Sequence, residues 1–463
     1  MTLKVFEAFS GVGSQAMALR DLGIDYEVVA TSDWDYHATL SYNAIHTDNP
    51  IDYAKDIEIN EIVEYLFKLK ISSDGKKPMT LEQIKRLPNQ KKQDIYNSFI
   101  NTNNLGSIME FTSDTIPDHD FFTYSFPCQD ISISGKGEGF DEGSGTRSGL
   151  LWECKKIIEV KKPKFLLLEN VKPLVGKKHQ LNFNRWCNWL ENQGYTNYWK
   201  ILNAKDYGVP QNRERVFMIS VLGPHEEFIF PSHEPSNRRL KDVLEKEVEE
   251  KFYISDEAAE NLLKKSNNPE AVMQDKSMLG MDGYVRGYDV YSPTITAREY
   301  KEPRLVQVGQ LFQTDSFGGN PQAGRVYDAE GVSPTLNTMQ GGNRQPKVIL
   351  PAIGASRGRP SESGKYEQHL EINRGEASNT LTGVLKDNYV INQNYRIRKL
   401  TPLECWRLMD FNDEDFYKAQ KVCSNSQLYK QAGNSIVKAV LMAIFRQMFF
   451  EQRGNGKGGI SND

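Results

Sequence analysis

The sequence has few cysteines and no long apolar run. Its five cysteines are spread over 463 residues without a Cys-x-x-Cys pair, which argues against a disulfide framework and a zinc ribbon. The longest apolar stretch, 439–445, is far too short to cross a bilayer. The first residues lack the basic and apolar regions of a secretory signal. The composition predicts a soluble cytoplasmic protein with neither a membrane partner nor a metal.

An excess of basic charge is also missing. The chain has 57 Lys and Arg against 61 Asp and Glu, a formal net charge of −4. Such a balance excludes a histone-like or polybasic nucleic-acid binder. It does not exclude a local basic cleft, because a dozen Arg and Lys side chains are diluted by the remainder of so long a chain.

The parts of the chain that are rich in Val, Ile, Leu and Phe alternate between short strand-like runs and helical periodicity. Strands are predicted at 3–9, 26–31, 121–126, 165–168 and 216–221, with helices at 15–22, 150–160 and 183–193. This alternation predicts an α/β fold, a doubly wound, mainly parallel sheet with helices on both faces.

Two segments depart from this pattern. Residues 58–113 are rich in Lys, Glu, Asn and Gln and predict a mostly helical insertion without chemistry of its own. Glycine-rich, β-prone sequence begins near residue 265. We therefore expect a first domain at 1–264, a smaller β-rich domain at 265–395, and a segment at 396–463 that returns to the first domain.

A glycine-rich turn follows the first predicted strand. Gly11 to Ala16 fits G-x-G-x-x-A, and Asp33 lies 20 residues past Gly13 at the end of the second strand. Glycines let a ligand approach the backbone, and the carboxylate can accept hydrogen bonds from a ribose. The pattern fits NAD, FAD or S-adenosylmethionine equally well, and a purely structural turn remains an alternative. Trp34 either stacks on an adenine or simply packs.

Two further strands end in reactive residues. Cys128 follows the strand at 121–126, and Glu169 follows the strand at 165–168. A lone cysteine is more often a core residue, but a carboxylate after four apolar residues needs an explanation. Ligands of doubly wound sheets bind beyond the carboxyl ends of the strands. We therefore expect Gly13, Asp33, Cys128 and Glu169 to converge on one crevice.

Six short motifs occur in a fixed order. They are Phe9–Gly13, Pro127-Cys128-Gln129, Glu169-Asn170-Val171, Gln211–Arg215, Arg398–Arg407 and Gln431–Ser435. Together they resemble the DNA cytosine-5 methyltransferase family of bacterial restriction-modification type. The departures are modest: Asp33 stands where the family more often has Glu, and the insertion is longer than a minimal member needs.

The resemblance implies methyl transfer to carbon 5 of cytosine in a specific double-stranded DNA sequence, with the base flipped out of the stack. It makes Cys128 the nucleophile that adds to carbon 6 and Glu169 the group that protonates N3. Arg213 and Arg215 would contact the base and the nearby backbone. The alternative for these two arginines is a surface ion pair with Glu214.

The resemblance also implies S-adenosylmethionine as the cofactor. The residues carried over to its site are Phe9, Gly11, Gly13, Asp33, Trp34, Asp56, Ile57, Pro127, Asn434 and Ser435. Asp56 fits a helix N-cap nearly as well. Asn434 fits a structural role.

The segment 265–395 is then expected to be a target-recognition domain. Arginine reads guanine through two hydrogen bonds, so Arg298, Arg325 and Arg344 are candidate base-reading residues, although solvated loop arginines are equally common. Ser132 and Ser134 belong to the Gly/Ser-rich segment 132–149, which we expect to close over a flipped base as it contacts DNA.

Three alternatives fit less well. An NAD-dependent oxidoreductase leaves Cys128 and Glu169 without a joint role. An RNA cytosine-5 methyltransferase shares the motifs, but a long glycine-rich segment favours the reading of duplex DNA. A catalytically inactive DNA-binding protein is disfavoured because every motif is intact. The expected enzyme is a monomer in the bacterial cytoplasm, associated with the nucleoid through DNA, and a cognate restriction endonuclease would act separately.

Overall fold

The chain divides into two compact units. The first consists of Met1–Arg238 together with Cys405–Asp463, and the second of Arg239–Glu404. The computed structural model describes residues 2–110, 112–127, 131, 147–233, 236, 238–253, 307–310, 325–328, 333–334, 336, 347–350, 353–360, 366–373, 388–389 and 396–450. Cys128, Ser132, Ser134, Arg298 and Arg344 lie outside the described residues, and Arg325 is described by its backbone alone. The unit boundaries stand at 238/239 and 404/405, whereas the sequence suggested 264/265 and 395/396.

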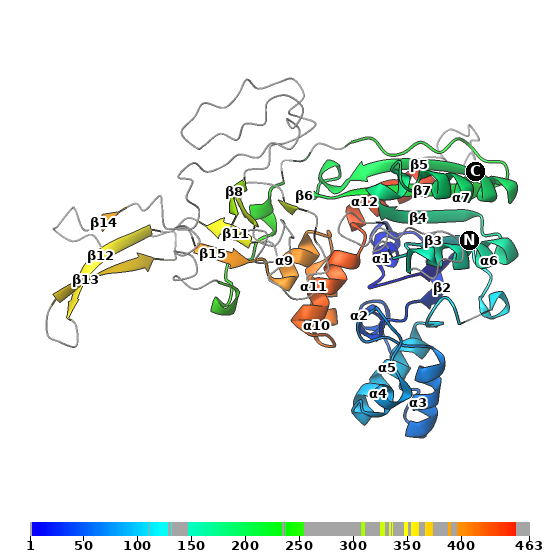
Figure 1. The fold of residues 1–463 in the computed structure, drawn as a ribbon, viewed down its shortest axis with the longest axis horizontal. Coiled ribbons are helices and arrows are strands. Elements are labelled where there is room, and N and C mark those ends of the chain that lie inside the picture. Colours follow the sequence, from blue (N-terminus) through cyan, green and yellow to red (C-terminus); the bar gives the residue numbers. More distant parts are fainter. Residues whose placement is uncertain are drawn as a thin grey trace, which may run out of the picture. The chain divides into compact units, whose positions relative to one another are not determined.

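A six-stranded sheet forms the centre of the first unit, in the order β2-β1-β3-β4-β7-β5 (Figure 1). Its strands are β1 (Leu3–Ala8), β2 (Tyr26–Ser32), β3 (Phe121–Tyr124), β4 (Phe165–Val171), β5 (Tyr195–Asn203) and β7 (Glu214–Leu222). The pairs β1–β2, β1–β3 and β3–β4 are parallel, and β7 runs antiparallel to β4 and β5. The predicted α/β class with a mainly parallel sheet is confirmed.

Helices cover the sheet on two faces because successive strand residues point to opposite sides. Phe122 and Tyr124 pack into a cluster with α6 (Leu151–Lys161) and α7 (Gln180–Asn192). Phe121 instead meets the rings of Phe445 and Phe449 on α12 (Lys438–Phe449). Helix α12 also contacts α1 (Ser14–Asp21), and Cys405–Asp463 belongs to the same compact unit as Met1–Arg238.

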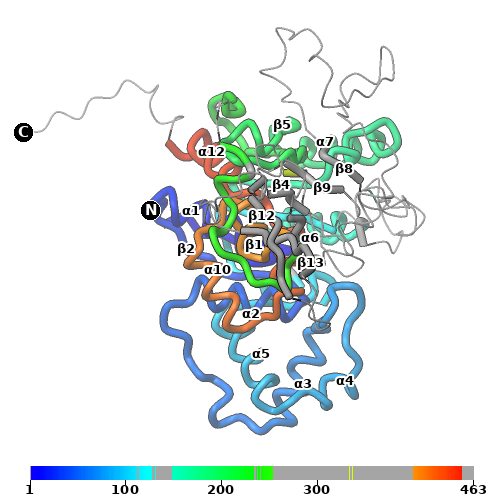
Figure 2. Tube along the Cα trace, turned by 90° about the vertical axis from the view of Figure 1, so that its left-hand side faces the viewer, coloured from blue at the N-terminus to red at the C-terminus, as the bar shows by residue number. Residues whose placement is uncertain are grey.

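The helical insertion, residues 58–113, packs against α2 (Tyr36–His46). It holds α3 (Ile59–Lys68), α4 (Leu81–Lys85) and α5 (Asn89–Asn101), which lie together at one end of the unit (Figure 2). The buried residues Ile62, Leu66 and Phe99 form a small core with Tyr36 and Leu40 of α2. The amphipathic insertion therefore needs α2 to bury its apolar face.

Strand β4 is longer than the sequence predicts. Its parallel partner β3 ends at Tyr124, opposite Leu168, and the sequence places the strand end there. Pairing with the antiparallel β7 continues as far as Val171, opposite Arg215. Glu169 and Asn170 are therefore held inside a paired strand, because the second neighbour extends past the first.

The remaining elements of the first unit complete its C-terminal half. They are β6 (Gln211–Asn212), α10 (Asp413–Gln420) and α11 (Asn425–Asn434), with α9 (Pro402–Arg407) at the unit boundary. In the part of the chain that is described, no helix is both long and apolar enough to cross a membrane.

The second unit carries two small sheets within its described residues. One has the order β15-β11-β9-β8 and the other β13-β12-β14. Their strands are β8 (Gln307–Gln310), β9 (Arg325–Asp328), β11 (Lys347–Leu350), β12 (Ile353–Pro360), β13 (Tyr366–Asn373), β14 (Asn388–Tyr389) and β15 (Arg396–Lys399). The short strand β10 (Ser333–Pro334) belongs to neither of these two sheets. The β-rich texture read from the sequence matches these strands.

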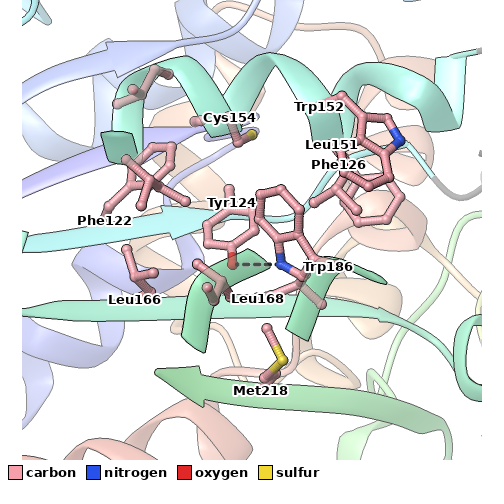
Figure 3. Packing of buried hydrophobic residues seen from close by; sticks show 14 of the residues in the cluster. Phe122, Tyr124, Phe126, Leu151, Trp152, Cys154, Leu166, Leu168, Trp186 and Met218 are labelled. Carbon is pink, nitrogen blue, oxygen red and sulfur yellow. Dashed lines mark hydrogen bonds between the residues drawn. The ribbon is translucent and has the colours of Figure 1, made fainter. Parts of the chain in front are cut away.

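Trp186 is the central side chain of the core between the sheet and its helices (Figure 3). It is fully buried, its Nε1 donates to the Tyr124 hydroxyl at 3.3 Å, and its ring meets that of Trp152 edge-on at 5.6 Å. Trp186→Ala removes this large buried surface and should lower the free energy of unfolding by about 3–5 kcal/mol. Urea unfolding followed by circular dichroism measures the loss.

Trp199→Ala is the matched control for this prediction. Trp199 is 47% exposed and touches only the ring of Phe183 among the aromatic contacts described. Its removal should cost about 1 kcal/mol. Equal losses in the two variants would contradict this assignment of the core.

Candidate active site

The glycine-rich turn follows β1 and is hydrogen-bonded to the end of β2. The Phe9 amide donates to the Ser32 carbonyl at 2.7 Å, and the Gly11 amide donates to Asp33 Oδ2 at 2.9 Å. Gly13 occupies the N-cap of α1 with φ +83°, in the left-handed region where glycine is favoured. The turn therefore directs the positive end of the α1 dipole toward the edge of the sheet where Asp33 lies.

Asp33 bridges the turn to the segment that leads into α2. Its Oδ1 accepts from the Asp35 amide at 2.8 Å, beside the bond from Gly11. Burial, and after it the charge of Asp35, raises the pKa of Asp33 to about 6, while the backbone donors and Lys430 oppose the rise. A carboxylate has about four acceptor positions, so two remain for a ligand.

The two glycines of the turn have different surroundings. A Cβ at Gly13 would lie 2.3 Å from His46 Nε2, so only glycine fits between the turn and α2. A Cβ at Gly11 would meet none of the described atoms within 4 Å, so that side of the turn is open beside the Asp33 carboxylate. An open glycine face, a carboxylate with spare acceptors and a helix N-terminus fit an adenosyl amino acid.

His46 supports the turn from behind. Its Nε2 lies 3.0 Å from the Val12 carbonyl, and burial lowers the pKa of His46 to about 4, so the neutral ring donates there. The adjacent Tyr42 hydroxyl donates to Glu7 Oε2 at 2.7 Å on β1. Burial raises the pKa of Glu7 to about 7, although the Tyr42 bond opposes this. No sequence motif marks Glu7, Tyr42 or His46, because they are ordinary strand and helix residues.

The other candidate cofactor residues lie near α2 and α3. Trp34 is half-buried and its carbonyl accepts from the Ser72 amide at 2.6 Å. Ile57 packs against the core of the insertion, and Asp56 is exposed. Glu58 is the N-cap of α3, so the alternative that Asp56 caps this helix is wrong.

Glu169 is a buried acid on β4. Its side chain is 9% exposed, and its Oε1 lies 3.3 Å from Arg215 Nε on the neighbouring β7. Burial raises the pKa of Glu169, and the charges of Arg215 and Arg213 partly oppose this effect. The carboxyl group can therefore hold a proton closer to neutral pH than an exposed glutamate can.

Asn170 ties β4 to the segment that leads into Cys128. Its Nδ2 donates to the Phe126 carbonyl at 2.9 Å, and its Oδ1 accepts from the Val171 amide at 2.8 Å. Pro127 follows as a half-buried residue. Asn170 therefore fixes the backbone at Phe126, which stands two positions before Cys128 in the sequence.

The two arginines act on different partners. Arg213 is buried, and its Nη2 donates to the carbonyls of Gly433 at 3.1 Å and Ser435 at 2.7 Å. Arg215 pairs with Glu169, as described above. The carboxylate of Glu214 pairs with Lys172 at 2.9 Å, so the alternative of an ion pair between the arginines and Glu214 is wrong.

The motif Gln431–Ser435 ends α11 and connects distant parts of the site. Gln431 Nε2 donates to the His37 carbonyl of α2 at 3.1 Å, and Ser435 Oγ donates to the Gln431 carbonyl at 2.7 Å. Asn434 is exposed at the end of the helix. Ser435 is buried and joins Arg213 through its carbonyl, a backbone role that its side-chain chemistry does not indicate.

Comparison with known proteins gives this arrangement a family. The family model for C-5 cytosine-specific DNA methylase matches residues 84–450. The chain is 37% identical over 453 residues to the type II methyltransferase M2.ScrFI of Lactococcus lactis subsp. cremoris, covering 97% of this chain and 100% of the relative. The chain belongs to the C-5 cytosine-specific DNA methylases.

Further relatives agree. The orphan methyltransferase M.SssI of Spiroplasma monobiae is 37% identical over 373 residues, covering 76% of this chain and 96% of that protein. The solved structure of the methyltransferase EhMeth of Entamoeba histolytica shares the fold, with a TM-score of 0.52 at 15% identity over 97% of this chain and 98% of that one.

The predicted family and enzyme class are therefore confirmed: the protein is a C-5 cytosine-specific DNA methyltransferase related to type II restriction-modification enzymes, and it acts on DNA. Membership of this family of methylases implies S-adenosylmethionine as methyl donor.

Asp33 predicts how cofactor binding varies with pH. If ribose hydroxyls donate to its ionised carboxylate, binding weakens as the pH falls through a pKa of about 6. Affinity for S-adenosylhomocysteine should then be about tenfold lower at pH 5 than at pH 7.5, since roughly a tenth of the carboxylate stays ionised. Isothermal titration calorimetry measures this. Asp33→Asn should bind weakly at every pH, and a pH-independent affinity in the unaltered enzyme would refute the role.

Proposed function

We propose that this enzyme methylates carbon 5 of a cytosine flipped out of a specific double-stranded DNA sequence, through covalent addition of Cys128 to carbon 6. The observation that carries the mechanism is the buried Glu169 carboxyl of raised pKa, with Asn170 beside it bonded to the segment that leads into Cys128. An acid and a nucleophile supplied by adjacent strands suit an addition that needs both at once.

Each residue has a defined task in this proposal. The Cys128 thiolate forms a bond to carbon 6, and the electron pair of the 5,6 double bond moves toward N3, which takes the proton of Glu169. When bound, S-adenosylmethionine supplies the methyl group that carbon 5 receives. Carbon 5 then loses its proton to a base, the bond between Cys128 and carbon 6 breaks, and N3 returns its proton to Glu169, so that Cys128 leaves as a thiolate with the aromatic ring restored.

The arginines prepare Glu169 for this task. Arg215 Nε lies 3.3 Å from the carboxyl, which fixes its orientation without restoring the full acidity that burial removes. Arg213 holds the carbonyls of Gly433 and Ser435 and so closes the site with α11. In our proposal Arg215 is also the arginine that can reach the base, because Arg213 is engaged with backbone.

The cofactor would be held by the glycine-rich turn and the two segments after β2. Asp33 has acceptor positions for ribose hydroxyls, and the open face of Gly11 leaves room for the nucleoside beside it. Phe9, Gly13, Trp34, Asp56, Ile57, Pro127, Asn434 and Ser435 remain candidates around it. No metal takes part in the proposed chemistry.

The second unit, Arg239–Glu404, would recognise the DNA sequence. Arg298, Arg325 and Arg344 stay predicted base-reading residues, and Ser132 and Ser134 stay predicted DNA contacts of the closing loop. A monomer in the bacterial cytoplasm, with or without a cognate restriction endonuclease acting separately, completes the proposal. Bisulfite sequencing of DNA from cells that express the protein would give the recognition site.

Glu169→Gln tests the acid. The amide keeps the shape of the side chain but is too weak an acid to transfer a proton to N3, so kcat should fall by about 10²–10⁴-fold. Transfer of tritiated methyl groups to DNA measures it, and Glu214→Gln is the matched control because that exposed carboxylate pairs only with Lys172 among its described salt bridges. Equal activity of Glu169→Gln and the control would exclude Glu169 as the proton donor.

A mechanism-based trap tests the nucleophile. Fluorine at carbon 5 cannot leave as a proton does, so a duplex containing 5-fluorocytosine should keep the enzyme covalently attached in denaturing gels. Cys128→Ser should form no adduct and transfer no methyl group while still binding DNA. Cys187→Ser should form the adduct normally, because burial raises the pKa of Cys187 to about 12 and leaves it a thiol. Lack of any adduct on substrate DNA would overturn the covalent mechanism.

A further inference from the structure

The helical insertion contacts the cofactor segment Asp33–Tyr36 at two places. In the loop after α3, the Ser72 amide donates to the Trp34 carbonyl at 2.6 Å, and the Ser72 carbonyl accepts from the Tyr36 amide at 3.1 Å. After α5, Asn104 Oδ1 accepts from the Asp33 amide at 3.1 Å. The segment that follows β2 is thus bonded to the loop between α3 and α4 and to the residues after α5.

Lys430 fastens the same segment from the C-terminal part of the chain. It lies on α11, is 5% exposed, and donates from Nζ to Asp35 Oδ2 at 2.6 Å and to the Asp74 carbonyl at 2.8 Å. Asp35 Oδ1 in turn accepts from the His37 amide at 3.0 Å and caps α2. One ammonium group therefore joins α11, the start of α2 and the first loop of the insertion.

The loop around Asp74 packs closely against this ammonium group. Ser72 Oγ donates to the Lys77 carbonyl and accepts from the Gly75 amide, which closes the loop on itself. A Cβ at Gly75 would lie 3.1 Å from Lys430 Nζ. The loop backbone and Lys430 are therefore in close contact, and a shift of one would move the other.

Lys430 also acts on Asp33 through its charge. Asp35 raises the pKa of Asp33 and Lys430 lowers it, and these are the charged neighbours that act on it from the α2 and α11 sides. On the insertion side Asn104 contributes only a neutral amide. Without Lys430, Asp35 would be left unbalanced and would disfavour the ionised form of Asp33.

We propose that Lys430 is a positioning residue for S-adenosylmethionine, which acts through Asp35 and the loop Ser72–Lys77 to hold Asp33 and Trp34, so that the helical insertion is a structural part of the cofactor site. The inference rests on the cofactor site proposed above. It assigns a role to a segment whose composition indicates only a solvated helical surface.

The test compares Lys430→Met with Lys438→Met in the full-length protein. Lys438 is equally buried at 4% exposed and has an ion pair of 2.5 Å with Asp21, but it lies on α12 and does not contact the insertion or Asp33 through any described bond. Calorimetry with S-adenosylhomocysteine gives the Kd, thermal melting gives the Tm, and gel shift gives DNA affinity. Each variant removes one buried ammonium group, so comparison of their Tm values separates a general loss of stability from a specific effect on cofactor binding.

Lys430→Met should raise the Kd for S-adenosylhomocysteine at pH 7.5 about tenfold, the loss expected when a charge-assisted hydrogen bond that holds the cofactor segment is removed. The pH midpoint of binding should move upward. Lys438→Met should change the Kd by no more than about twofold and the pH midpoint by no more than about half a unit. Its Tm should fall about as much as that of Lys430→Met. Lys430→Arg, which keeps the charge, should recover the midpoint.

A Kd and a midpoint unchanged by Lys430→Met would overturn the inference, as would equal changes in Lys438→Met. If Lys430→Met fails to fold, Ser72→Ala decides, because it loosens the loop without removing a charge. It should raise the Kd by about threefold with Tm nearly kept, and an unchanged Kd would refute the role of the loop. Failure of the unaltered enzyme to bind S-adenosylhomocysteine would instead refute the proposed cofactor site.

Discussion

The site depends on the burial of two carboxyl groups, Asp33 and Glu169, near the carboxyl ends of β2 and β4. Asp33 and Glu169 both lose hydration, and burial raises the pKa of each. Each is kept in place by a different compensation: Asp33 by two backbone amides, Glu169 by the guanidinium of Arg215. The consequence is a division of tasks, because a carboxylate held by amides suits hydroxyl donors and a carboxyl beside one cation suits proton transfer.

These compensations bring together distant parts of the chain. Lys430 donates to Asp35, and Arg213 donates to the carbonyls of Gly433 and Ser435. Helix α11 is therefore bonded both to the segment after β2 and to the residue before β7. The C-terminal return of the chain therefore does more than cover the sheet. It supplies Lys430 to the cofactor segment and accepts the hydrogen bonds of Arg213, whose charge also acts on Glu169, and in this way couples the geometry of the cofactor side to that of the proposed catalytic side.

The sequence predicted the mainly parallel sheet and the family, because apolar periodicity and short motifs are local signals. It did not predict that β4 continues through Glu169, since that depends on an antiparallel neighbour reaching further than a parallel one. It grouped Arg213 with Arg215 by their spacing, but Arg213, between β6 and β7, bonds to the end of α11, whereas Arg215 on β7 pairs with Glu169. The roles of Tyr42 and His46 behind the glycine turn were equally invisible, because nothing in a helix sequence says which loop its side chains support.

By itself the sequence determined the class of fold, the family of methylases and the residue types that the chemistry needs. Composition could not reveal DNA as the substrate, because a net charge of −4 averages over surfaces that never meet it. Tertiary structure alone decided which acid is buried, which cation balances it and what the insertion touches. Those properties depend on desolvation and on distances between residues hundreds of positions apart, such as Asp35 and Lys430, and only the packed chain brings such pairs within hydrogen-bond reach.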